Sequence, residues 1–176
     1  MMSCQCTAAT VMASLRYSVR AYAAQGDEPD VILTKLATLL SIKDDGHFAT
    51  VLCGRIDLPA RRLVLANAGH LDPLLITGGA ASYLRTQPGV PIGAIDSPRY
   101  RPLTLDLPAA GTLLLYTDGL IERRGESLDT GFTRLARAAE KEADAPVEAL
   151  LAGVVNDLIP GGASDDTALL GLRWTT

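Results

Sequence analysis

The sequence has few cysteines and no stretch suited to a membrane span or an export signal. Its three cysteines are Cys4, Cys6 and Cys53, and this odd number argues against a disulfide framework and favours a reducing compartment. Cys4-x-Cys6 has the start of a metal-binding pattern, but no second pair of Cys or His lies at ligand spacing. No basic N-terminal segment precedes an apolar run, and no run is long enough to span a bilayer. We therefore expect a cytoplasmic protein.

Positive charge is also scarce. The chain has 16 Lys and Arg against 20 Asp and Glu, which gives a formal net charge of −4. Its basic clusters, Arg61-Arg62 and Arg123-Arg124, are isolated pairs. Neither a nucleic acid nor a membrane surface is therefore an expected partner.

The composition is that of a globular protein. The 176 residues are 48% hydrophobic and 20% charged, enough to build a sizeable core. No internal repeat or linker divides them. We expect residues 1–7 to form a disordered N-terminus and residues 8–176 to form a single domain.

Periodicity predicts the secondary structure. Apolar residues at steps of three and four predict four helices, with Gly26 ending the first and Pro29 in the first turn of the second. These helices are expected at residues 8–24, about 28–41, 131–143 and 146–158. Short extended runs between Gly and Pro breaks, such as Gly78-Gly79, predict antiparallel strands. The strands are expected at 48–57, 61–67, 73–77, 82–85, 101–106, 112–117 and 167–174, with 101–106 near an edge. The pattern indicates an α+β fold of layered antiparallel sheets with helix pairs.

Carboxylates stand at the ends of two apolar strands. Asp118-Gly119 follows the run 113–116, and Asp165-Asp166 precedes the run 167–172. A strand end and a strand start can meet in space, and hard oxygen ligands of this kind suit Mg²⁺ or Mn²⁺. Taken alone, the two segments fit a turn and a solvated loop better than they fit a metal site.

Five motifs in order carry a family resemblance. They are Phe48-Ala49-Thr50, Asn67-Ala68-Gly69-His70, Gly89-Val90-Pro91-Ile92-Gly93, Thr117-Asp118-Gly119 and Asp165-Asp166. Across residues 8–173 the chain resembles the metal-dependent PPM serine/threonine phosphatases, in the branch of sporulation stage II protein E and the sigma-B regulators. The resemblance implies an αββα sandwich and hydrolysis of phosphoserine or phosphothreonine by water that two Mn²⁺ or Mg²⁺ ions activate. It also implies a phosphorylated anti-anti-sigma factor of the STAS type as the substrate.

The resemblance assigns roles to individual residues. Asp118 and Asp165 match positions that bind metal directly, and Asp166 is adjacent to them and can hydrogen-bond water at the ion. Gly119 allows close backbone approach to the ion because it lacks a Cβ. Glu122 also matches the pattern, although a carboxylate in the first turn of a helix explains it equally well.

The segment Asn67–His70 matches a turn that leads out of a strand near the site. Asn67 and Gly69 are expected to shape this turn. His70 either donates a proton to the leaving serine oxygen, a role for which histidine is the commonest side chain, or holds the turn by hydrogen bonds.

One departure from the family is large. The family carries Asp-Val-x-Gly-His-Gly before its first long helix, and that Asp bridges the two metal ions, whereas Met1–Cys6 stands there in this chain. The chain therefore resembles the family domain without its N-terminal strands. Three interpretations stay open: an active phosphatase, an impaired phosphatase-like module that docks a STAS partner, or a fragment. Missing strands also predict an exposed strand edge through which two copies can associate.

Overall fold

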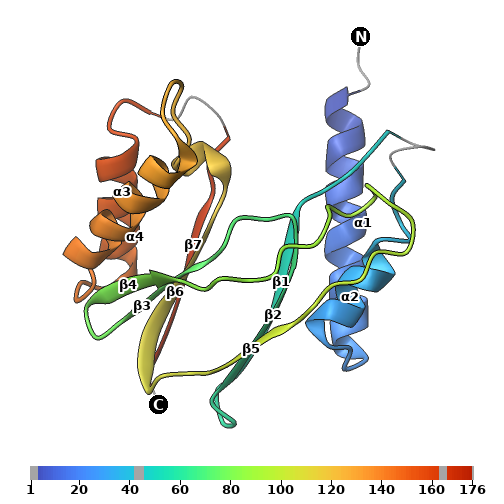
Figure 1. Ribbon diagram of the computed structural model, residues 1–176, viewed down its shortest axis with the longest axis horizontal. Helices are drawn as coiled ribbons and strands as arrows, with labels where there is room; N and C mark the ends of the chain where they lie inside the picture. The colour runs from blue at the N-terminus through green and yellow to red at the C-terminus, as the bar shows by residue number, and fades with distance from the viewer. Residues whose placement is uncertain (1–3, 42–45, 163–165, 176) are drawn as a thin grey trace. The chain divides into compact units, whose positions relative to one another are not determined.

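Figure 1 shows the computed structural model of the chain, which describes residues 4–41, 46–162 and 166–175. The chain divides into two compact units, each with its own sheet and helices. The first comprises residues 1–70 and 86–106, and the second comprises residues 71–85 and 107–176. Within the described part of the chain, no helix has the length and apolar character needed to cross a membrane.

The first unit is a three-stranded antiparallel sheet with two helices, in the strand order β1-β2-β5. Its elements are α1 (Cys4–Ala24), α2 (Pro29–Leu36), β1 (Val51–Asp57), β2 (Arg62–Ala68) and β5 (Leu103–Asp106). Helix α2 packs on β1 and β2, and α1 packs on α2. Leu33 and Leu36 of α2 are fully buried in a core with Ala66 and Ala68 of β2.

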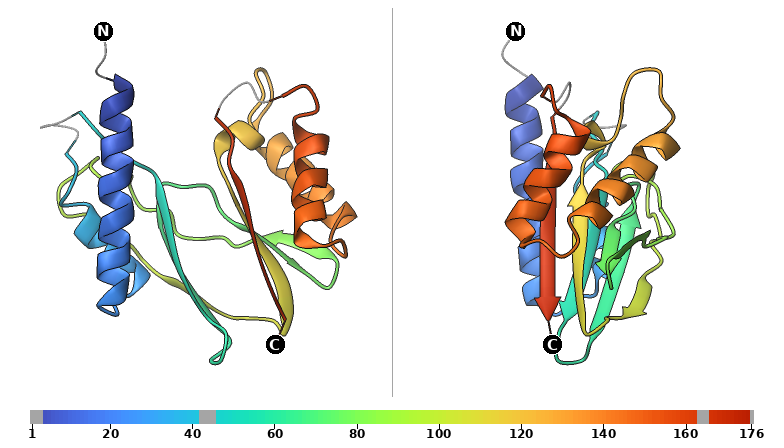
Figure 2. Two further views of the ribbon diagram at one scale, coloured as in Figure 1. Left: turned by 180° about the vertical axis from the view of Figure 1, so that it is seen from behind. Right: turned by 90° about the vertical axis from the view of Figure 1, so that its left-hand side faces the viewer.

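The second unit is a four-stranded antiparallel sheet in the order β4-β3-β6-β7. Its elements are β3 (Leu74–Thr77), β4 (Ala80–Tyr83), β6 (Ala110–Tyr116), the 3-10 helix η1 (Asp118–Leu120), α3 (Leu128–Lys141), α4 (Val147–Leu158) and β7 (Leu169–Thr175). Gly78 and Gly79 join β3 to β4, and their φ angles of 56° and 81° suit the two-residue turn of a tight hairpin. Both views of the ribbon show α3 and α4 on the same face of this sheet (Figures 1 and 2).

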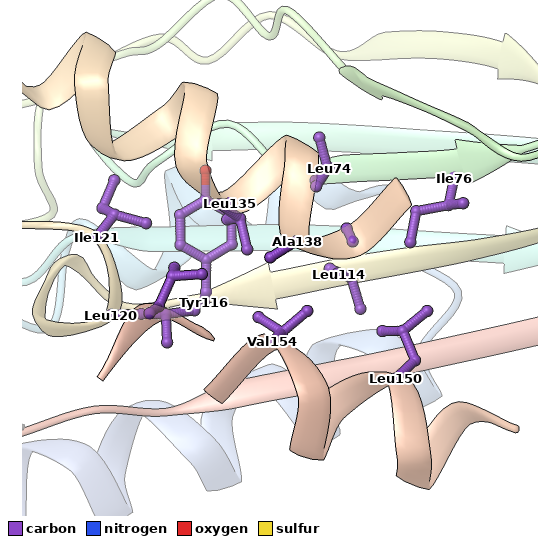
Figure 3. Close-up of a cluster of buried hydrophobic side chains, with 12 residues drawn as sticks. Leu74, Ile76, Leu114, Tyr116, Leu120, Ile121, Leu135, Ala138, Leu150 and Val154 are labelled. Carbon is purple, nitrogen blue, oxygen red and sulfur yellow. The ribbon is translucent and has the colours of Figure 1, made fainter. Parts of the chain in front are cut away.

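The core of the second unit lies between its sheet and its helices (Figure 3). Leu114 of β6 is fully buried against Leu135 of α3 and Leu150 and Val154 of α4. Removing such side chains from water supplies most of the stability of a domain this small. The same core holds Tyr116 at the end of β6, so the strand that leads to Asp118 is rigidly anchored.

The sequence correctly predicts an α+β fold with two antiparallel sheets and four helices. All seven predicted strands are present, and β5 lies at a sheet edge as expected. Several boundaries differ by two or three residues, and the two largest errors concern helices. Helix α1 begins at Cys4, within the segment 1–7 predicted to be disordered, because no residue from Cys4 to Thr7 breaks a helix. Helix α2 ends at Leu36 rather than near Ser41, because the Thr38 and Leu39 amides bond three residues back and tighten the last turn.

Candidate metal centre

Asp118 lies where the buried strand β6 turns into η1. Tyr116 ends the strand with only 3% of its surface exposed, and its hydroxyl donates a hydrogen bond to the Asp72 carbonyl at 2.9 Å. The Asp118 carbonyl accepts hydrogen bonds from the amides of Ile121 (2.9 Å) and Glu122 (2.8 Å). Its carboxylate Oδ1 accepts one from the Gly119 amide at 3.0 Å. The Asp118 side chain is therefore exposed to solvent on a backbone that is fixed from both sides.

The segment before β7 lies directly beside this turn. Strands β6 and β7 are antiparallel with Tyr116 opposite Leu169, so the next pair along is Thr117 and Ala168. The Thr117 amide donates to the Ala168 carbonyl at 3.1 Å. This ladder brings the backbone of Asp166 next to the turn that carries Asp118.

Gly119 marks the closest approach of the two segments. A Cβ atom at this position would lie 2.6 Å from the Asp166 carbonyl oxygen and 3.0 Å from Thr167 Oγ1. The neighbour that requires a glycine here is thus the backbone of Asp166. A residue with a side chain would separate Asp118 from Asp166.

Of the other predicted acidic residues, only Asp166 and Glu122 lie among the described residues. Asp165 lies outside the described residues. Asp166 and Glu122 are exposed, and Glu122 follows η1 with its amide bonded to Asp118. Among residues 4–41, 46–162 and 166–175, no group of three or more His, Cys, Asp or Glu side chains gathers as a metal site. Asp118 and Asp166 nevertheless lie on two segments in backbone contact, and their carboxylates are hard oxygen donors of the type that Mg²⁺ and Mn²⁺ prefer.

Tyr116 is buried in the core of the second unit, and the half-buried Tyr83 packs against the same core. Burial raises the pKa of Tyr83 to about 12, with the Tyr116 hydrogen bond and the charge of Arg85 acting in the opposite direction. Burial also raises the pKa of Tyr116 well above its ordinary value. Both shifts follow from the removal of the phenols from water, which disfavours their charged forms.

The segment Asn67–His70 belongs to the first unit and forms a closed turn. The Asn67 side chain is 1% exposed. Its Oδ1 accepts a hydrogen bond from the His70 amide at 2.7 Å, and its Nδ2 donates to the His70 carbonyl at 2.9 Å. Gly69 has a φ of 78°, a left-handed conformation that favours glycine. The turn is therefore held by Asn67 and permitted by Gly69.

Thr86 is a partner of this turn that sequence reasoning missed. Asn67 Nδ2 also donates to Thr86 Oγ1 at 2.7 Å, and Thr86 is 8% exposed. The Asn67 carbonyl accepts a bond from the Gly89 amide at 2.8 Å, which brings the motif that begins at Gly89 against the turn. No local sequence signal distinguishes Thr86 from the chain's other threonines, since its partner lies 19 residues away.

Comparisons with known proteins agree with this fold. The family model described as Stage II sporulation protein E (SpoIIE) matches residues 6–175. The phosphoserine phosphatase RsbP of Bacillus subtilis (strain 168) is 30% identical over 76 residues, which are 43% of this chain and 19% of that protein.

Two solved structures of related bacterial proteins share this fold. The RsbU and RsbW domains of Rv1364c from Mycobacterium tuberculosis align with a TM-score of 0.79 and 29% identity, over 93% of this chain and 47% of that one. The phosphatase domain of SpoIIE from Bacillus subtilis, presoaked with Mn, aligns with a TM-score of 0.58 and 17% identity, over 94% of this chain and 73% of that one. This chain thus spans about half of the Rv1364c chain and a smaller part of RsbP. The match over residues 6–175 shows that the chain belongs to the SpoIIE family of PPM-type serine/threonine phosphatases.

Proposed function

We propose that this chain is a metal-dependent protein phosphatase that hydrolyses phosphoserine or phosphothreonine in a bacterial regulatory protein. One observation carries the proposal. Asp118 stands on a fixed turn against the Asp166 segment, in a chain that matches the SpoIIE family over residues 6–175. The Mn-presoaked SpoIIE domain, with which the chain shares its fold, supports the choice of a divalent cation.

In this proposal some acidic residues bind the metal and another orients water. Asp118 and Asp165 bind Mn²⁺ or Mg²⁺, and Asp166 orients water beside them. Gly119 keeps the two segments in contact. When bound, the ion lowers the pKa of water and offsets negative charge on the phosphoryl group. Glu122, exposed after η1, adds negative potential at the same turn.

The proposed substrate is a phosphorylated anti-anti-sigma factor of the STAS type. RsbP is a phosphoserine phosphatase, and the Rv1364c structure joins an RsbU domain to an RsbW domain. Both relatives support a place in sigma-factor regulation. The cytoplasmic location predicted from the cysteine count stays a prediction.

An impaired binding module that docks the same partner is the alternative. It is favoured by the lack, among the described residues, of a cluster of three or more metal-binding side chains. If Asp118 and Asp165 held a single ion, it would offset charge on the phosphoryl group but would lower the pKa of water less than a two-ion centre does, so we expect hydrolysis by these 176 residues barely above background.

Phosphate release from a phosphoserine protein in Mn²⁺ separates the two functions. We expect Asp118→Asn and Asp165→Asn to abolish the residual rate, whereas Asp144→Asn, an exposed carboxylate outside the site, leaves it unchanged. Fusing a relative's Asp-Val-x-Gly-His-Gly segment to the N-terminus should raise the rate by orders of magnitude. A fused chain that keeps its rate with Asp165→Asn would refute the metal mechanism. A fused chain that binds the partner but stays inactive would favour the binding module.

His70 is proposed as the proton donor to the leaving oxygen, with a purely structural role as the alternative. A proton donor matters most when the leaving group is a poor one such as serine. We expect His70→Gln to slow hydrolysis of a phosphoserine peptide strongly and that of p-nitrophenyl phosphate little. Equal losses on both substrates would indicate that the imidazole only supports the turn.

A further inference from the structure

The hydroxyl of Thr117 takes the place of a backbone group where β6 ends. Thr117 has an extended backbone, with φ −94° and ψ 162°, and pairs with Ala168 as the next step of the antiparallel ladder. Its amide donates to the Ala168 carbonyl at 3.1 Å, as the ladder requires. The return bond is different, because the Ala168 amide donates to Thr117 Oγ1 at 2.9 Å instead of to the Thr117 carbonyl.

Because the hydroxyl accepts the hydrogen bond from Ala168, the Thr117 carbonyl is available to another donor. The carbonyl accepts a hydrogen bond from the Leu120 amide at 3.1 Å, which is the bond that starts the η1 turn. One backbone oxygen would otherwise have to serve both the ladder and the turn. The hydroxyl thus allows the strand to stay paired up to the residue before Asp118 while the chain turns at Asp118 itself.

The same hydroxyl reaches the other acidic segment. Thr117 Oγ1 donates to the Asp166 carbonyl at 3.4 Å. A single side chain therefore contacts the backbone on both sides of Thr167 and holds it against the turn that carries Asp118.

We infer that Thr117 is a positioning residue for a divalent cation that Asp118 would hold beside Asp166. This inference rests on the metal site proposed above and adds a residue to it that binds no metal itself. Residues that orient metal ligands typically change affinity by about 10- to 100-fold when they are lost. We expect a loss in this range for Thr117→Val, which keeps the shape of the side chain and removes the hydroxyl.

The fold should tolerate this change. The hydrogen bonds from Thr117 Oγ1 to Asp166 and from Ala168 to Thr117 Oγ1 lie in an exposed region, so water can replace the hydroxyl. Thr117→Ser keeps the hydroxyl and should restore affinity. Thr77→Val is the matched control, because Thr77 Oγ1 makes a similar bond of 3.4 Å to the Ala110 carbonyl at the opposite end of the same sheet.

The experiment is a titration of each full-length variant with MnCl₂, in which the electron paramagnetic resonance signal reports free Mn²⁺. Melting temperatures without metal are measured in parallel. We expect Mn²⁺ affinity to fall about 10- to 100-fold in Thr117→Val and to be retained in Thr117→Ser and Thr77→Val. If Thr117→Val does not fold, Thr117→Ala, which places no methyl group against the Asp166 carbonyl, takes its place.

Asp118→Asn separates a failure of the inference from a failure of the metal site. If Asp118→Asn binds Mn²⁺ as well as the unmodified chain does, both the proposed site and the role of Thr117 are overturned. If Asp118→Asn loses affinity but Thr117→Val does not, only the role of Thr117 is overturned. A lower melting temperature in Thr117→Val with unchanged Mn²⁺ affinity would also overturn it, because the hydroxyl would then serve folding alone.

Discussion

Replacing Gly119 with alanine tests whether the contact between the two acidic segments is needed for metal binding. The added Cβ would lie 2.6 Å from the Asp166 carbonyl oxygen, whereas ordinary contact begins at 3.4 Å. One segment must therefore move by about 0.4 Å to reach the 3.0 Å below which real Cβ atoms are essentially never found, and by about 0.8 Å to reach ordinary contact. Because the obstacle is backbone, no side-chain rotation relieves the clash.

The size of this shift predicts the outcome. Functional groups must be held within about 0.5 Å of their productive geometry, so a movement of this size separates the ligands of a shared ion. Overpacking of this kind also costs about 1–3 kcal/mol of stability. We expect Gly119→Ala to lose most of its Mn²⁺ affinity and to unfold at a lower denaturant concentration.

Gly161→Ala is the control for this substitution. A Cβ at Gly161 meets no atom within 4 Å, and its φ is not in the left-handed region. Its stability should stay unchanged or rise by a few tenths of a kcal/mol, since alanine restricts the unfolded chain. Calorimetric titration with Mn²⁺ and urea unfolding measure the two effects. Gly119→Ala with the stability and Mn²⁺ affinity of Gly161→Ala would refute the close contact.

Three further predictions concern other parts of the chain. Burial raises the pKa of Tyr83 from 10.0 to about 12. The folded state therefore holds the phenol proton more tightly than the unfolded state, and the stability that this difference contributes is complete below pH 10 and is lost as the pH rises through 12. Alkaline unfolding and tyrosinate absorbance should coincide in that range, and full ionisation at pH 10 of a chain that stays folded would contradict this. Burial raises the pKa of Cys53 from 9.0 to about 11, so labelling of its thiol, followed by peptide mapping, should be slow until the chain unfolds. Among the described residues β7 pairs only with β6, which leaves its other edge unpaired, and Leu170 and Leu172 of this strand are 52% and 39% exposed. We therefore expect two copies of the chain to associate through β7, sedimentation to detect this association and Leu170→Lys to weaken it. A monomer at every concentration would exclude it.

The local elements of this protein follow from the sequence alone. The four helices and seven strands of the described residues are set by apolar periods and by breaks such as Gly78-Gly79, which act over a few residues. Pro29 begins α2 as predicted, because its fixed φ and missing amide suit a first helical turn. The motifs also placed Asp118 at a strand end. Those features depend on neighbours in the chain, so a pattern of neighbouring residues is enough to predict them.

The arrangement around the acidic residues was decided by tertiary structure. The sequence shows Gly119 and Asp166 only as two separate motifs, and the register of β6 with β7 determines that they touch. The sequence shows Thr117 only as part of the Thr117-Asp118-Gly119 motif. The role of its hydroxyl depends on Ala168, which is 51 residues away in sequence but opposite it in the sheet. A hydrogen bond between distant residues depends on strand register, and register is fixed by the packing of whole sheet faces rather than by any local pattern.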